Sequence, residues 1–119
     1  EQYITLSTAC TLGNIIQEIG HTVGLWHEQN RADRDQQVTI NFGNIQSGAE
    51  NNFQTYVQAN YDGFDLGSAI DFGSVMMYSP YDFSSNGQPT ITKKDGSIYS
   101  IQRDGLSPMD IATVKAMYP

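Results

Sequence analysis

Positively charged residues are scarce in this chain of 119 residues. Six Lys and Arg stand against 13 Asp and Glu, which gives a formal net charge of −7. Nucleic acids and anionic membrane surfaces are bound by clustered Lys and Arg, so we expect neither as a partner. The sequence also lacks an apolar run long enough to span a bilayer. It shows no signal peptide, which a mature secreted chain would already have lost.

Cysteine is almost absent as well. Cys10 is the only one, so no disulfide can close within these residues. One interpretation is a small, buried hydrophobic side chain. The other is a cysteine whose partner lies outside this sequence, because an odd cysteine in a secreted protein indicates an incomplete pair. The residues alone leave both interpretations open.

Several short segments have the alternating polar and apolar pattern of β-strands. Residues 2–7 and 38–42 alternate in this way and are predicted to be strands. Residues 91–92 and 98–99 flank Asp95-Gly96, which predicts a hairpin. Neither a repeat nor a linker divides the chain, and 39% hydrophobic residues fit a single small globular domain.

Three segments are predicted to be helical. Apolar residues recur at helical spacing over 12–25, with Thr11 as the N-cap and Gly24 as the residue that ends the helix. A second helical segment is expected over 52–61. A last helix follows Ser107, which is its expected N-cap.

Residues 17–28 carry most of the functional information. Their sequence, QEIGHTVGLWHE, matches the zinc-binding pattern H-E-x-x-H-x-x-G-x-x-H at every fixed position except the first, which is Gln17. Side chains at 17 and 21 share one helix face and can reach one metal ion. Gly24 permits the sharp turn that would return His27 to the same ion.

Glu18 lies beside the first ligand position, where it can hold a water against the metal without binding the metal itself. Each residue alone has an ordinary interpretation. A lone His21 is more often structural or exposed, and a lone Glu18 is more often a solvated helix residue. Four matching positions at this spacing nevertheless indicate descent from a zinc site.

The wider sequence resembles one protease family. Residues 18–35, EIGHTVGLWHEQNRADRD, resemble the astacin family of the metzincin clan, and we expect the bacterial type. Residues 74–78, SVMMY, resemble its Met-turn S-x-M-H-Y. The resemblance implies that Met76 forms an apolar base beneath the metal. It also implies that Tyr78, which alone would be an ordinary core aromatic, is a zinc ligand that swings away to stabilise the oxyanion.

This resemblance implies a fold and a function for the whole chain. The fold is α+β and metzincin-like, with a zinc-site helix and a C-terminal lobe. Residues 1–119 form a partial peptidase domain consisting of an edge strand, the active-site helix and the C-terminal lobe, and most of the N-terminal sheet lobe is missing. The implied function is that of a secreted, Zn²⁺-dependent endopeptidase in which Glu18 is the general base for metal-activated water.

The expected partners follow from the same resemblance. The substrate is a polypeptide, and a missing N-terminal segment or a second chain would complete the upper lobe. Cys10 then pairs with an upstream cysteine. Glu28 contacts the processed N-terminus in this family, a role for which Glu1 is not suited.

Gln17 is the departure that bears on activity. The candidate metal ligands are Gln17, His21, His27 and Tyr78. An amide oxygen is a weaker donor to zinc than an imidazole nitrogen, so we expect impaired activity. The sequence leaves open whether Gln17 is natural, engineered or an error. Met77, which replaces the usual histidine of the Met-turn, is expected to be tolerated because that position is not a ligand.

Two alternative functions remain at this stage. The chain could be an inactive pseudo-protease that still binds peptides in the old cleft. It could also be a structural fragment produced by processing, which would fold only with an upstream partner.

Overall fold

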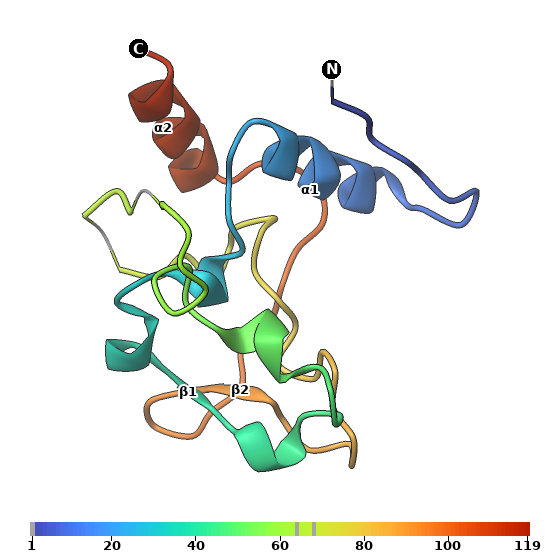
Figure 1. Cartoon of the computed structure of the whole chain (residues 1–119), viewed down its shortest axis with the longest axis vertical. Coiled ribbons are helices and arrows are strands. Elements are labelled where there is room, and N and C mark those ends of the chain that lie inside the picture. Colours follow the sequence, from blue (N-terminus) through green and yellow to red (C-terminus); the bar gives the residue numbers. More distant parts are fainter. Residues whose placement is uncertain (1, 64, 68) are drawn as a thin grey trace.

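The computed structural model describes residues 2–63, 65–67 and 69–119. Figure 1 shows the α-helices gathered at one end of the molecule and the paired β-strands at the other. Loops and short 3₁₀ turns make up most of the remainder. Within the described residues, no helix has the length and apolar character needed to cross a membrane.

Helix α1 (Leu12–Thr22) begins and ends at the predicted capping residues. The Thr11 hydroxyl accepts a hydrogen bond from the Asn14 amide at 3.3 Å, as an N-cap should. At the other end Gly24 has a φ of +105°. Its left-handed conformation turns the chain away from the helix axis, so α1 ends slightly before the predicted residue 25.

Two main-chain hydrogen bonds close this turn. The Gly24 amide donates to the His21 carbonyl at 3.0 Å, and the Leu25 amide donates to the Gly20 carbonyl at 2.9 Å. This pair of bonds is the Schellman motif, which satisfies carbonyls that the helix end would otherwise leave without partners.

Strands β1 (Val38–Ile40) and β2 (Ile91–Lys93) pair antiparallel, with Val38 opposite Lys93. The predicted turn forms at Asp95-Gly96, where the Gly96 amide donates to the Lys93 carbonyl at 3.0 Å. The prediction that 98–99 is the partner strand is wrong. Pairing with β1 places both Val38 and Ile91 in the core, fully buried, and this burial decides the partner.

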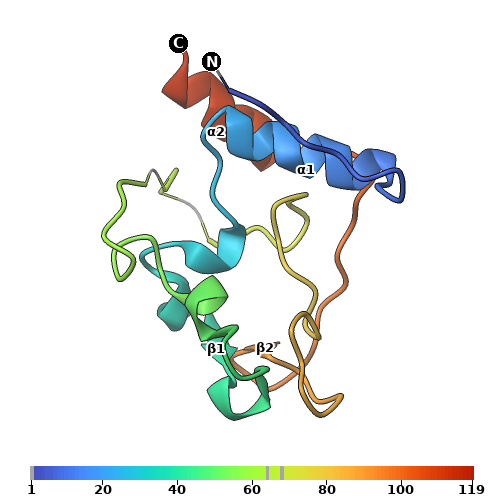
Figure 2. The same ribbon diagram turned by 45° about the vertical axis from the view of Figure 1, so that its right-hand side comes forward.

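Helix α2 (Pro108–Met117) begins with the predicted N-cap. Ser107 and Asp110 form a capping box, in which the Ser107 hydroxyl accepts from the Asp110 amide at 3.0 Å and the Asp110 carboxylate accepts from the Ser107 amide at 2.9 Å. Figure 2 shows α1 and α2 together above the rest of the chain. Ile16 of α1 and Val114 and Met117 of α2 are partly buried against one cluster, formed by Leu25, Val75 and Met76.

The Met-turn contributes to both parts of the hydrophobic core. Met76 belongs to the cluster between the helices, with Leu25 and Val75. Met77 belongs to the larger cluster around the strands, whose other buried members are Val38, Ile45, Phe53, Ile70, Ile91 and Tyr99. Residues 74–78 therefore join the helical end of the molecule to the end that holds the strands.

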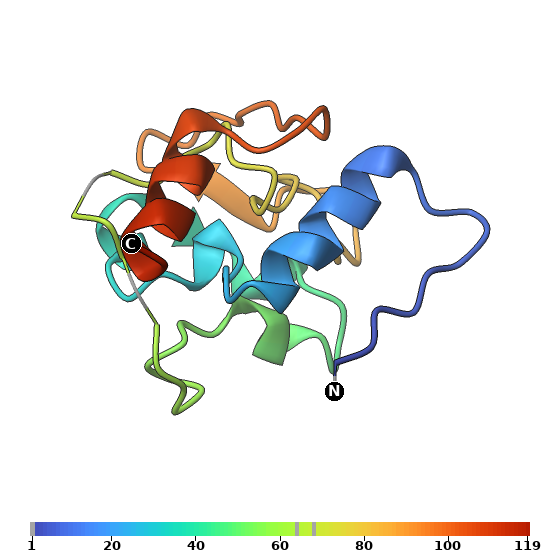
Figure 3. The same ribbon diagram turned by 90° about the horizontal axis from the view of Figure 1, so that it is seen from above.

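Two other predicted elements do not form in this chain. Residues 52–61 contain the end of a 3₁₀ helix (Glu50–Phe53) and then turns, because Phe53 is buried whereas Val57 is 62% exposed and offers no continuous apolar face. Residues 2–7 form no strand, and this exposed segment runs beside α1 (Figures 1 and 3). A strand needs a hydrogen-bonded neighbour, and its pairing with a preceding strand stays a prediction.

Asp110 links the Met-turn to α2 and is expected to dominate local stability. Besides capping α2, its buried carboxylate accepts from the Ser74 hydroxyl at 2.5 Å and from the Val75 amide at 3.1 Å. We expect Asp110→Ala to lower the free energy of unfolding by about 3 kcal/mol, because it leaves several buried donors unpaired. Urea unfolding would measure the loss, with the exposed Asp104→Ala as the control. A loss no larger than that of the control would contradict the assigned role.

Candidate metal centre and cleft

The structure brings His21 and His27 together. Their Nε2 atoms lie 3.1 Å apart, and their ring centroids are separated by 4.4 Å at an interplanar angle of 82°. Two nitrogen ligands of a tetrahedral zinc ion, each ~2.0–2.1 Å from the metal, lie roughly 3.3 Å apart. The two imidazoles are therefore placed to share one such ion.

Hydrogen bonding and burial leave these imidazoles suited to binding a metal. His21 Nδ1 lies 2.9 Å from the Leu25 carbonyl oxygen. A carbonyl only accepts, so Nδ1 carries a proton, and in the neutral imidazole Nε2 is the nitrogen with the lone pair. Burial lowers the pKa of His27 to about 3, with smaller contributions from nearby His21 and Arg103. His27 is therefore neutral at physiological pH, as a metal ligand must be.

Met76 packs against α1 at Gly20, the residue before His21. It is 1% exposed, and a Cβ atom built on Gly20 would meet its sulfur at 2.7 Å. The Met76 carbonyl accepts a hydrogen bond from the Glu28 amide at 3.2 Å, which links the segment after His27 to the Met-turn. The expected apolar base therefore packs directly under the helix that carries His21.

Tyr78 lies against His27, as the family resemblance leads us to expect. The two ring centroids are 4.5 Å apart, with Phe53 and Phe83 at 5.9 Å and 5.8 Å from the Tyr78 ring. Burial, together with the negative charge of Asp82, raises the pKa of the Tyr78 phenol. In this structure Tyr78 is thus a neutral phenol that can donate a hydrogen bond.

Gln17 and Glu18 lie on α1 one turn before His21. Gln17 is partly buried and Glu18 is exposed. Glu18 and His21 line an open hollow of about 360 Å³, which residues 2–5 border on its other side. The expected general base thus faces the same hollow as one of the two histidines.

A second cleft, of about 250 Å³, is also lined by His21, together with His27 and Tyr78. Its walls are rich in amide and aromatic side chains, including Trp26, Asn30, Asn51, Asn52, Gln54 and Tyr61. Trp26 and Asn30 lie within residues 18–35, whereas the others lie far from the zinc-binding pattern and follow no fixed spacing, so the sequence pattern did not identify them. The amide-rich run at 51–54 was the one local signal.

The ligand set has two imidazoles where the zinc-binding pattern has three. Among the residues that the structure describes, no three His, Cys, Asp or Glu side chains gather to hold a metal. The geometry of His21 and His27 fits zinc, whereas the contributions of Gln17 and Tyr78 to the ligand set stay predictions.

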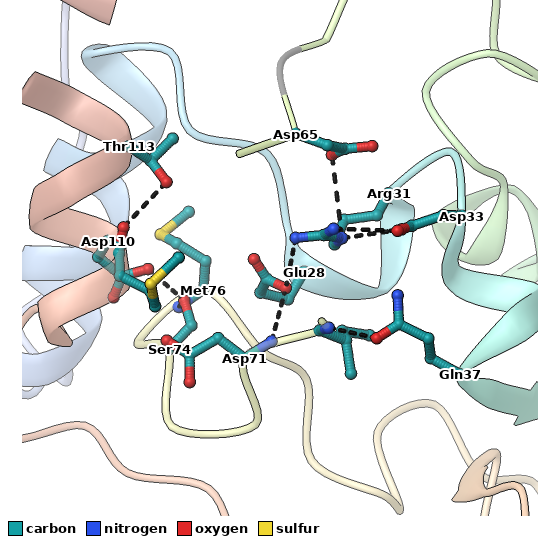
Figure 4. A network of polar contacts seen from close by, with 12 residues as sticks. Glu28, Arg31, Asp33, Gln37, Asp65, Asp71, Ser74, Met76, Asp110 and Thr113 are labelled. Atoms are coloured by element: carbon teal, nitrogen blue, oxygen red, sulfur yellow. Dashed lines mark hydrogen bonds and ion pairs between the residues drawn. The ribbon is translucent and has the colours of Figure 1, made fainter. Parts of the chain in front are cut away.

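Buried charges hold the loop that follows His27. Figure 4 shows Glu28 between Arg31 and the main chain of Asp71. The Glu28 carboxylate accepts from the Asp71 amide at 3.1 Å and lies 3.9 Å from Arg31, which donates to Asp33 at 2.9 and 3.0 Å. Burial raises the pKa of Glu28 to about 7. A cavity of about 40 Å³ adjoins Glu28, and contact with a processed N-terminus stays a prediction.

Comparison with known proteins places these residues in a family context. The whole chain, residues 1–119, matches the family model for the astacin peptidases. Blastula protease 10 of Paracentrotus lividus is 42% identical over 121 residues, covering 99% of this chain and 20% of that protein. Flavastacin of Elizabethkingia meningoseptica is 43% identical over 105 residues, covering 87% of this chain and 23% of that protein.

A solved structure is also similar. High choriolytic enzyme 1, a hatching enzyme zinc-protease from Oryzias latipes (medaka fish), superposes with a TM-score of 0.78 at 35% identity, covering 89% of this chain and 52% of that one. The chain thus spans about a fifth of the length of these two curated relatives and about half of the solved one. Because both animal and bacterial proteins are similar, the bacterial type stays a prediction.

Restoring the missing imidazole is expected to strengthen metal binding. Losing an outer-shell partner of a ligand already costs about 10–100-fold in affinity, so Gln17→His, which adds a ligand, should raise zinc affinity about 100-fold or more. Competition with a chromophoric chelator would measure the change. Gln36→His adds a histidine at an exposed site outside the cleft and serves as the control. Equal affinities for the two variants would rule out Gln17 as a ligand position.

Proposed function

The chain belongs to the astacin family of metalloendopeptidases, and on this premise we propose that it carries the catalytic residues of a zinc-dependent endopeptidase. The observation that carries the proposal is the meeting of His21 and His27 at an Nε2 separation of 3.1 Å beside the ring of Tyr78. The similarity to a solved zinc-protease supports the same metal.

The proposed zinc ligands are His21, His27, the amide oxygen of Gln17 and the phenol of Tyr78. When bound, zinc polarises a substrate carbonyl and makes a nearby water more acidic. An amide oxygen in place of a third imidazole holds the ion less firmly. We therefore propose that Gln17 impairs the activity of this form of the protein without changing the class of reaction.

Two side chains of this chain would transfer protons and stabilise negative charge during peptide hydrolysis. Glu18 accepts a proton from the attacking water and passes it to the leaving amine. Tyr78 donates a hydrogen bond to the oxyanion of the tetrahedral intermediate, a role that its raised phenol pKa supports. The substrate is a polypeptide whose scissile bond lies at His21, which lines both hollows.

We further propose a secreted protein in which additional residues complete the domain. The chain spans 52% of the solved relative, which leaves room for an N-terminal segment or a second chain. Ile4 and Leu6 are 41% and 43% exposed, and such a segment would cover them. In this proposal Cys10 pairs with a cysteine of that additional part.

One observation favours a second candidate, a pseudo-protease that binds peptides without cleaving them. Gln17 removes one metal ligand, whereas the cleft lined by His27 and Tyr78 is still present at about 250 Å³. This candidate requires measurable peptide affinity without turnover, even after the histidine is restored.

The two candidates differ in the activity of Gln17→His. Our proposal predicts that the zinc-loaded variant hydrolyses an unfolded protein substrate, and that adding Glu18→Gln lowers kcat by about 10²–10⁴-fold with the zinc content unchanged. Release of new amino termini and metal analysis would measure both. A Gln17→His protein that binds one zinc ion, binds peptides and cleaves none would instead establish the pseudo-protease.

A further inference from the structure

The main-chain carbonyls on both sides of Tyr78 are held by side chains from another part of the chain. The Met77 carbonyl, which belongs to the peptide group before Tyr78, accepts from the Arg103 guanidinium at 2.8 Å. The carbonyl of Tyr78 itself accepts from the Tyr99 hydroxyl, also at 2.8 Å. Arg103 and Tyr99 thus hold successive peptide groups.

The amides of the same two peptide groups are held as well. The Tyr78 amide donates to the side-chain oxygen of Gln29 at 3.4 Å. The Ser79 amide donates to the Asp82 carboxylate at 2.9 Å. Each polar group in the two peptide units that flank Tyr78 therefore has a side-chain partner.

The anchors Tyr99 and Gln29 are themselves fixed by burial. Tyr99 is 8% exposed, and its ring packs on Phe72 with centroids 4.7 Å apart. Burial also raises the pKa of the Tyr99 phenol, so its hydroxyl stays protonated and can donate. Gln29 is fully buried, and within the described residues its side-chain nitrogen has no hydrogen-bond partner. A buried nitrogen without a partner is unfavourable, which fits a side chain retained for its oxygen.

The side chain of Tyr78 is held by weaker contacts than its main chain. Residues 74–78 belong to neither β1 nor β2, so no strand ladder fixes their backbone. The Tyr78 ring touches its neighbours through tilted or edge-on aromatic contacts, which are individually weak. Side-chain rotation is therefore less restrained than any change of backbone conformation.

We propose that the backbone of Tyr78 is clamped so that only its phenol moves toward and away from His21 and His27, and that the clamp consists of four positioning residues, Gln29, Asp82, Tyr99 and Arg103. This inference rests on the role assigned to Tyr78 in the proposed function. The clamp would make the movement of the phenol precise. Without it, a loop that lacks the hydrogen bonds of a β-sheet would let the whole residue shift.

The first test measures, in metal-free protein, whether the clamp restrains the position of Tyr78. Tyr99→Phe keeps the ring and removes only the hydroxyl. Tyr118→Phe is the matched control, because the Tyr118 hydroxyl also donates to a main-chain carbonyl, that of Val23, at 2.9 Å. With 3-fluorotyrosine placed at 78, ¹⁹F NMR should give one narrow resonance for the parent and the control, and a shifted, broadened one for Tyr99→Phe. A Tyr99→Phe resonance identical to that of the parent would overturn the proposal.

The second test measures activity and metal coordination in the metal-bound protein that carries Gln17→His. Tyr99→Phe should leave the zinc stoichiometry and KM unchanged and lower kcat about fivefold, the effect of one neutral hydrogen bond expressed only in the transition state. In the Cu²⁺-loaded protein the phenolate-to-copper absorption band should weaken. An unchanged kcat and an unchanged band would overturn the clamp even if the ¹⁹F signal moved.

Failure of the clamp and failure of the proposed function give different results. If Gln17→His neither binds zinc nor cleaves protein, the proposed function fails, and the ¹⁹F comparison in metal-free protein still decides the clamp. Where Tyr99→Phe does not fold, Asp82→Ala takes its place, because it removes the acceptor of the Ser79 amide. The same shifted and broadened resonance is expected.

Discussion

At Gly24 the main chain adopts a φ of +105°, and the two hydrogen bonds that close this turn carry His27 back over the end of α1. A side chain at this position would be strained, because a Cβ atom disfavours the left-handed region. The same turn presents the Leu25 carbonyl to His21 Nδ1 at 2.9 Å, which orients the imidazole. One backbone conformation therefore sets both the distance between the histidines and the direction of a lone pair.

Beyond this turn, side chains rather than a sheet hold the loops of the site in place. The only ladder in the described residues is short and joins β1 to β2 at the far end of the molecule. Asp110 fastens the Met-turn to α2, and Glu28 fastens the segment after His27 to Asp71. Buried carboxylates and amides can do this because each accepts from main-chain groups that would otherwise lack partners.

Local signals explain which features were predictable from sequence. Thr11, Gly24 and Ser107 were identified correctly because caps and left-handed turns depend on a few neighbouring residues. The convergence of His21 and His27 followed from helix geometry and one glycine. The closeness of Tyr78 to His27 came from the family resemblance, since no spacing rule joins residues so far apart.

Features that depend on tertiary contacts were not predictable. The hairpin signal at Asp95-Gly96 predicted a strand at 91–92, but the partner of that strand was decided by burial against β1 and not by the adjacent turn. The spacing of Phe53, Tyr56 and Val57 suggested a helix, yet only Phe53 is buried in the core. The bonds that Gln29 and Tyr99 make to Tyr78 span 49 and 21 residues, and no pattern in the sequence connects them.

We propose that this chain forms a metal centre with two imidazoles, His21 and His27, and oxygen in the place of the third. X-ray absorption at the zinc edge tests it most directly, because imidazole rings and single oxygen atoms scatter differently. For the zinc-loaded protein as it stands, the account predicts two imidazoles with the remaining ligands oxygen. Scattering from a sulfur ligand, or from fewer than two imidazoles, would contradict it.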